Sequence, residues 1–156
     1  MKLKDLFESW DLKGLKVKAG ILEMDWQPYD ADKNAAWEMY IELLTSITTQ
    51  KLPDEHGIEE TALQSVYKIF EITRDVLKRN GRKCVNFTKI AIIVLNQVIR
   101  PFTAKWHKLS EMGDFEDKGQ CKVFREELLE LQDKLLCYTK LLSELADVED
   151  LTELEE

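Results

Sequence analysis

A run of apolar residues near the C-terminus constrains the fold of this chain more than any other feature of its sequence. Between residues 121 and 145 these residues recur at alternating intervals of three and four. Such intervals are typical of helices that pack at about 20° to one another, as in coiled coils and four-helix bundles. The spacing predicts one long helix over residues 119–146, with a buried seam of Cys121, Phe124, Leu128, Leu131, Leu135, Tyr138, Leu142 and Leu145.

An earlier stretch, which follows Pro28, also has helical spacing. Asp30 or Asp32 can cap its first turn, because a short carboxylate accepts hydrogen bonds from the free N–H groups there. We expect this helix to end near Gln50. Its predicted buried stripe is Trp37, Tyr40, Ile41, Leu44 and Ile47.

Two further helices are expected between these stretches. One begins at Glu59, where a carboxylate favours the positive end of the helix dipole, and ends at Gly81, which can adopt positive φ. The other, which Asn86 is expected to cap, is apolar nearly all round over residues 87–99 and should therefore lie centrally. The stripe predicted for the first of these helices is Leu63, Val66, Tyr67, Phe70 and Leu77.

The helices together predict an all-α, antiparallel four-helix bundle that forms a single domain over residues 1–156. The 6 glycines and 3 prolines are too few for an architecture with many tight turns. Residues 1–29 are expected to form an irregular or extended segment on the bundle, with possible strands over 15–26, and residues 147–156 an acidic tail. Surplus leucines on the last helix predict a further packing partner, either the N-terminal segment or a second copy of the chain. They are Leu129, Leu136 and Leu141.

Several classes of protein do not fit the sequence. The charged N-terminus lacks the apolar core of a secretory signal, and the longest apolar run, residues 90–95, is far shorter than the roughly 20 residues that span a bilayer. The 3 cysteines have no close pairing, and the chain has only 2 histidines, so neither a zinc cluster nor a histidine-rich metal site is indicated. We expect a cytoplasmic protein with no metal ion, no cofactor and no membrane contact.

Charge is distributed unevenly along the chain. The chain as a whole carries a net charge of −8, yet residues 74–108 contain nine basic residues and one acid, for a net charge of +8. Such a segment can attract RNA, dock an acidic partner or pair with the chain's own acids. The candidate binding residues for RNA or an acidic partner are Arg79, Arg82, Lys83, Lys89 and Lys105.

One motif in this basic segment has the residue types of a catalytic site. Arg100 and His107 are separated by six residues, and positions i and i+7 share a face of an unbroken helix. The pair resembles the R-x(4–6)-H motif of HEPN domains, helical bundles that include metal-independent ribonucleases. The resemblance implies that His107 transfers the proton of a ribose hydroxyl or leaving group and that Arg100 holds the phosphate charge. Asn96, one turn earlier, could help to orient the site.

A structural interpretation of the same motif is also available. Phe102 and Trp106 have the spacing of core residues, and Arg100 and His107 would pair with acids of neighbouring helices. Pro101 should kink or restart the helix, because proline lacks an N–H and disfavours helical dihedrals at the preceding residue. Our first expectation is therefore a non-enzymatic adaptor, regulatory or accessory subunit of a larger bacterial complex, with itself or another protein as its partner. The alternative is a HEPN-like ribonuclease or RNA-binding domain.

Overall fold

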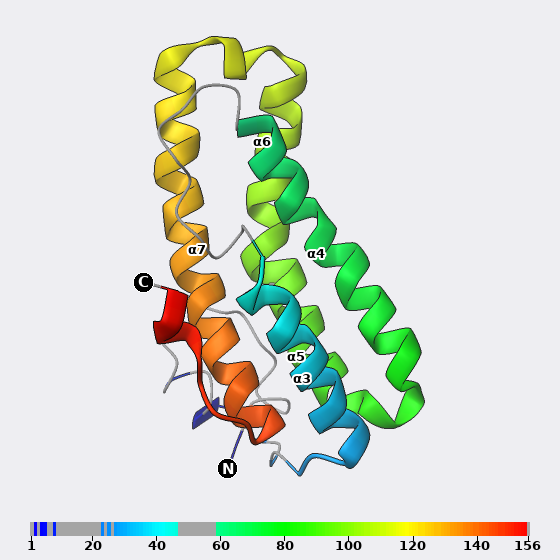
Figure 1. Ribbon diagram of the computed structural model, residues 1–156. Coiled ribbons are helices and arrows are strands. Elements are labelled where there is room, and N and C mark those ends of the chain that lie inside the picture. The colour runs from blue at the N-terminus through cyan, green and yellow to red at the C-terminus, as the bar shows by residue number, and fades with distance from the viewer. Residues whose placement is uncertain are drawn as a thin grey trace.

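The computed structural model of the chain describes residues 2, 4, 5, 8, 23, 25, 27–46 and 59–155. Helical rods run up, down, up and down in this part of the chain, so the predicted antiparallel four-helix bundle is confirmed (Figure 1). No helix among the described residues is both long enough and apolar enough to cross a membrane. The rods are α3 (Asp30–Leu44), α4 (Glu59–Asn80), α5 (Val85–Val94) continued through the π-helical η3 (Leu95–Ile99) into α6 (Arg100–Glu111), and α7 (Lys118–Ala146). The 3-10 turns are η2 (Arg82–Cys84), η4 (Asp114–Glu116) and η5 (Thr152–Glu155).

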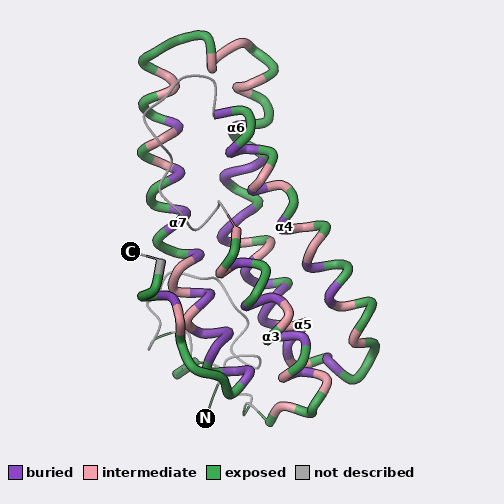
Figure 2. The backbone as a smooth tube through the Cα atoms, viewed as in Figure 1, coloured by how far each residue is buried: buried purple, intermediate pink, exposed green. Residues whose placement is uncertain are grey.

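The long helix α7 carries the predicted seam into the core. All of its members from Phe124 to Leu145 are buried, and only Cys121 at the first turn is partly exposed (Figure 2). Each buried leucine or phenylalanine contributes about 1.5–3 kcal/mol through the hydrophobic effect. The three leucines for which a further packing partner was predicted differ in exposure. Leu141 is buried within this chain, Leu136 is half-buried and Leu129 is exposed. Leu141 therefore needs no further partner.

Helix α3 differs from its prediction in both orientation and length. The buried face consists of Ala35, Ala36, Met39, Tyr40 and Leu43, so two residues of the expected stripe point outward. These are Trp37, which is 49% exposed, and Ile41. Because alanine side chains are small, neighbouring helices can approach this face of α3 closely. Hydrophobicity alone would have favoured burial of the face that carries Trp37 and Ile41. The helix ends at Leu44, where the Thr45 hydroxyl donates to the Ile41 carbonyl oxygen; Ile47 and Gln50 lie outside the described residues.

Asp32 joins the starts of two helices. This fully buried carboxylate accepts hydrogen bonds from the backbone N–H of Tyr29 (2.9 Å), from the backbone N–H of Phe87 (2.9 Å) and from the Asn86 side-chain amide (3.3 Å). Asn86 is thus not the cap of its helix, as the sequence suggested, because the η2 turn precedes it and α5 already begins at Val85. A carboxylate from α3 takes the capping role instead.

The turn between α4 and α5 forms as predicted. Helix α4 ends at Asn80, and Gly81 has φ of 78°, a backbone conformation that side chains with a Cβ rarely adopt. Glu38 of α3 ties this turn to the bundle, because it accepts from Arg79 Nε (2.9 Å) and from the Asn80 amide (2.6 Å).

Helices α5 and α6 form one rod with a π-helical turn in the middle (Figure 1). Arg100 N–H donates to the Leu95 carbonyl oxygen, five residues back, rather than to the fourth residue back. This wider turn precedes Pro101, whose missing N–H breaks the regular pattern in any case. The predicted restart at Pro101 therefore takes the form of a π-turn, with Arg100 itself in helical conformation.

The residues after α7 return to the bundle. Asp147, with φ of 58°, ends the helix, and the backbone then runs along α3, where the buried Tyr40 hydroxyl donates to the Glu149 carbonyl oxygen (3.2 Å) and accepts from Leu151 N–H (2.8 Å). The predicted acidic tail is thus attached to α3 as far as it is described. Most of the expected extended segment over 15–26 lies outside the described residues, although an antiparallel bridge joins Lys2 to Asp25.

Candidate functional site: the face between α4 and α6

The residues of the R-x6-H motif lie on the side of α6 that adjoins α4. Asn96, Arg100 and His107 are all exposed, so none of them is used to fill the core. Arg100 Nε donates to the Asn96 side-chain oxygen (3.1 Å), as expected for residues one turn apart. The structure thus brings the three predicted site residues to one solvent-accessible face.

Arg100 is held from below by an aromatic ring. Its guanidinium carbon lies 5.1 Å from the centroid of the Phe70 ring on α4, within the range of a cation–π contact. This contact and the bond to Asn96 use one face of the guanidinium and its Nε, while neither Nη group has a hydrogen bond to any residue that the structure describes. A planar guanidinium oriented in this way is suited to bind two oxygens of a phosphate or carboxylate.

His107 is positioned by residues that the sequence analysis did not assign to the site. Its ring meets the Tyr67 ring edge-on at a centroid distance of 6.0 Å, and its Nε2 lies 3.3 Å from Glu111 Oε1. The Tyr67 hydroxyl donates to the Thr103 carbonyl oxygen (3.0 Å), and this fixes α4 against α6 between Arg100 and His107. Burial, with a smaller contribution from the nearby Glu111 carboxylate, raises the pKa of Tyr67. Tyr67 therefore stays a neutral hydrogen-bond donor at ordinary pH.

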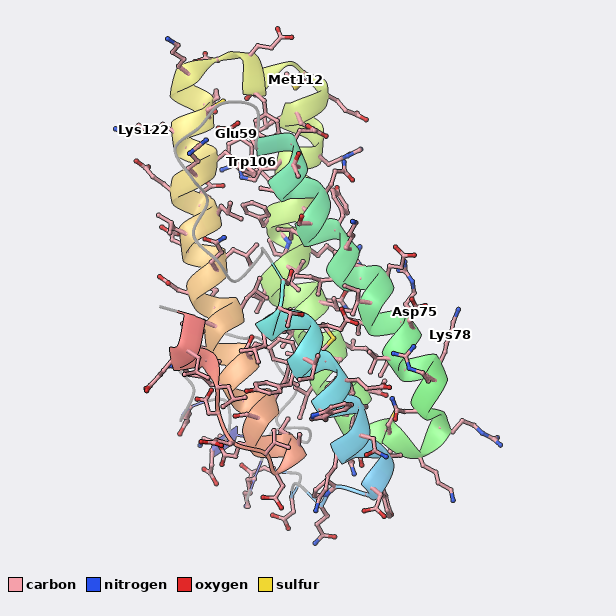
Figure 3. The ribbon with its side chains drawn as sticks, viewed as in Figure 1. Glu59, Asp75, Lys78, Trp106, Met112 and Lys122 are labelled. Carbon is pink, nitrogen blue, oxygen red and sulfur yellow. The ribbon has the colours of Figure 1, made fainter. Side chains whose placement is uncertain are left out.

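The opposite side of α6 belongs to the core, as the structural interpretation expected. Phe102 and Trp106 are buried, and the Trp106 indole N–H donates to Glu127 of α7 at 2.6 Å (Figure 3). The Trp106 ring also stacks on Phe115 and meets Phe124 edge-on. This packing fixes the rotation of α6 about its axis and so keeps the Arg100–His107 side turned to solvent.

The structure divides the candidate basic residues into two groups. Arg79 pairs with Glu38, Lys105 pairs with Glu127, and Lys89 also has an interaction within the chain. Arg82 and Lys83 are exposed in the η2 turn and have no ion pair among the described residues. Three other basic residues of the segment are exposed and equally without an ion pair in the described part of the chain, namely Arg74, Lys78 and Lys108.

Two further surfaces lie away from the Arg100–His107 face. An open groove at the start of α4 is lined by Phe115, Cys121, Leu129 and the ion pair between Glu59 and Arg125, whose atoms are 2.8 Å apart. Burial raises the pKa of the Cys121 thiol in this groove, which disfavours its thiolate form.

On α3 the outward residues Trp37 and Ile41 lie one turn apart and form a small exposed apolar patch. Tyr29, also exposed, lies two turns before Trp37, just ahead of the helix. These residues appeared in the sequence as members of a core stripe or a loop, so the spacing alone could not identify them as surface.

Phe70, Tyr67 and Glu111 are the site residues that the sequence analysis missed. Tyr67 and Phe70 carried the same 3–4 spacing as core residues, and nothing in the sequence indicated which of them would contact α6. Glu111 could have been found, because it follows His107 by four residues, the interval at which helical side chains meet. A comparison with protein-family models, curated proteins and solved structures found no match for the chain.

Proposed function

We propose that this chain binds RNA at the face between α4 and α6 and cleaves it there without a metal ion, with Arg100 and His107 as the catalytic residues. One observation carries the proposal: both side chains are exposed on the same side of one helix, and separate contacts from α4 orient each of them. Burial of either side chain against the core would have ruled out this role, and both are exposed. The resemblance to the HEPN motif supplies the reaction.

The proposed step balances with the residues of this face and solvent. Neutral His107 takes the proton of the ribose 2′-hydroxyl, the O2′ attacks the adjacent phosphorus, and the bond from phosphorus to O5′ breaks. Solvent protonates O5′, and His107 returns its proton to solvent. The products are a 2′,3′-cyclic phosphate and a 5′-hydroxyl, while Arg100 stabilises the charge that develops on the non-bridging oxygens.

The geometry of α6 is compatible with a shared phosphate. The helix is regular from Arg100 to Glu111, so Arg100 and His107 are separated by about 10.5 Å along its axis. Arg100 Nε points back to Asn96 and His107 Nε2 points forward to Glu111, so both side chains would have to turn toward each other to meet at a phosphate above Thr103 and Ala104. Glu111, on the far side of His107, would hold the imidazole in place, as a carboxylate does for the base in many hydrolytic sites.

The test is RNA cleavage in the presence of a chelator. The wild-type chain should release a 2′,3′-cyclic phosphate, and His107→Ala should lower the rate by about 100-fold or more, which is the contribution of a positioned general base. His56→Ala is the matched control, because His56 is the other histidine of the sequence. Equal cleavage by the wild type and His107→Ala, or cleavage by neither, would refute the proposal.

A second candidate function follows from the apolar patch on α3. Trp37 and Ile41 expose large side chains on one outward face, and exposed tryptophans often anchor protein partners. In this role the chain would be a non-enzymatic adaptor or accessory subunit. Pull-downs with the wild type and with Trp37→Ser, analysed by mass spectrometry, should differ in a partner, and sedimentation of both variants would detect self-association. Identical partners and identical masses for the two variants would reject this function.

A further inference from the structure

We propose that Arg74 and Lys78 of α4 form a second phosphate-binding subsite beside Arg100, which holds the RNA strand on one side of the cleaved bond. This inference rests on the proposed function of the Arg100–His107 face and names residues that the motif does not contain. A longer RNA strand would contact α4 on the side of the cleavage site that lies toward the η2 turn.

The position of Phe70 connects the two subsites. Phe70 lies directly beneath the Arg100 guanidinium, so α4 and α6 touch at this level. Arg74 follows Phe70 by one helical turn on the same face of α4, about 6 Å along the axis, and Lys78 follows by two turns, about 12 Å. Tyr67, which contacts His107, lies on the other side of Phe70. Because the helices are antiparallel, the order along this surface is His107, Arg100, Arg74 and Lys78.

The charges on α4 favour this path for an anion. Arg74 and Lys78 are exposed and have no ion pair among the described residues, and Lys78 points away from the bundle (Figure 3). Arg79, the neighbour of Lys78, is instead neutralised by Glu38 of α3. Each residue turns an α-helix by about 100°, so Arg74 lies about 40° and Lys78 about 80° around from Phe70, with Glu71 and Asp75 beyond them at about 100° and 140°. A strand of phosphates can therefore follow Arg74 beside α6 and continue outward to Lys78.

The same contacts favour a single strand over a duplex. The Arg100 guanidinium rests on Phe70 and the residue is exposed, so an unpaired base could stack on the guanidinium from the solvent side. Attack by a 2′-hydroxyl also needs the attacking and leaving oxygens in line at phosphorus, an arrangement that a flexible strand reaches and an A-form duplex does not. The flanking phosphates would then contribute binding that does not depend on sequence.

Binding measurements at different salt concentrations test the subsite. The probe is a fluorescent oligouridine of about 12 nucleotides, whose length is within the range of single-strand binding sites. Each phosphate that the protein neutralises steepens the fall of log affinity with log salt by about 0.7 for a single strand. Arg74→Ala and Lys78→Ala should therefore each make this fall shallower by about 0.7. Arg79→Ala, which removes an exposed cation already paired with Glu38, is the matched control and should leave the slope unchanged.

A cleavage comparison separates failure of the subsite from failure of the proposed function. A ribodinucleotide has a single phosphate and so offers none to Arg74 when that phosphate lies at Arg100, so Arg74→Ala should cleave it at the wild-type rate while losing several-fold in kcat/KM on the oligouridine. Equal losses on both substrates, or salt slopes for Arg74→Ala and Lys78→Ala that match Arg79→Ala, would overturn the subsite but leave cleavage by His107 standing. Binding of polyglutamate with the same dependence on Arg74 and Lys78 would also overturn it, since the surface would then recognise acidic protein.

Discussion

Replacing Asp32 tests how the bundle closes at the end where α3 and α5 begin. In Asp32→Ala the backbone N–H of Phe87 becomes a buried donor without a partner, which costs about 1–3 kcal/mol. Helix α3 also loses the carboxylate that accepts from Tyr29 N–H, a capping interaction worth about 1 kcal/mol. The Asn86 amide loses one partner but keeps the Gln27 carbonyl oxygen. We therefore expect a total loss of about 2–4 kcal/mol in the free energy of unfolding.

Urea denaturation followed by circular dichroism measures this loss, and thermal unfolding should show a drop of about 4–16 °C in Tm for a chain of this size. Asp32→Asn keeps one acceptor oxygen and can still serve Phe87, so it should lose only about half as much. Asp30→Ala is the control, because Asp30 is an exposed acid in the same first turn and should cost less than about 1 kcal/mol. A loss for Asp32→Ala no greater than that of Asp30→Ala would refute the shared-cap argument.

Substitutions of Tyr138, Gly81 and Gly113 should also change the free energy of unfolding in a definite direction or order. Tyr138 is buried, and its hydroxyl has no hydrogen-bond partner among the described residues. Tyr138→Phe should therefore leave the free energy of unfolding unchanged or raise it by up to about 1 kcal/mol. A clear loss in urea denaturation would show that the hydroxyl has a partner. Burial raises the pKa of Tyr138, so the unfolded chain ionises first above about pH 10, and the wild type should lose more stability there than Tyr138→Phe. Gly81 has φ of 78° and ψ of −170°, a region nearly restricted to glycine, and there is open space where a Cβ would lie. Gly81→Ala should therefore lower the free energy of unfolding by about 1–3 kcal/mol through backbone strain alone. Gly113, at φ of 82° and ψ of 16°, lies in the ordinary left-handed region, and Gly113→Ala should cost less; the reverse order in urea denaturation would contradict this account.

Sequence periodicity predicted the fold well where one face of a helix is strongly apolar. The seam of α7 and the end of α4 at Gly81 follow directly from spacing and from the backbone freedom of glycine. Periodicity failed for α3, because Ala35 and Ala36 carry little hydrophobicity but fit where helices pack closely, whereas Trp37 carries much and does not fit. Small residues at close contacts leave a weak signal in any pattern based on hydrophobicity.

The candidate site was only partly predictable for a related reason. Spacing within one helix places Arg100 and His107 on one face, and the structure agrees. Contacts between helices depend on their relative rotation, which the sequence does not state, so Phe70 and Tyr67 could not be assigned to the site. The same limit applies to charge, because the pairing of Arg79 and Lys105 with acids of other helices separates them from Arg74 and Lys78 only in three dimensions.

The π-helical turn before Arg100 sets the direction in which α6 presents its side chains. A π-turn amounts to one extra residue in an α-helix, and one residue corresponds to a rotation of about 100°. Winding Leu95–Ile99 as regular α-helix with all five residues kept would therefore turn everything downstream by about a quarter of a circle, taking Arg100 off Phe70 and Trp106 out of the core together. Deleting one residue at this turn should instead restore a regular helix with both side chains near their present directions, whereas an insertion there should not be tolerated.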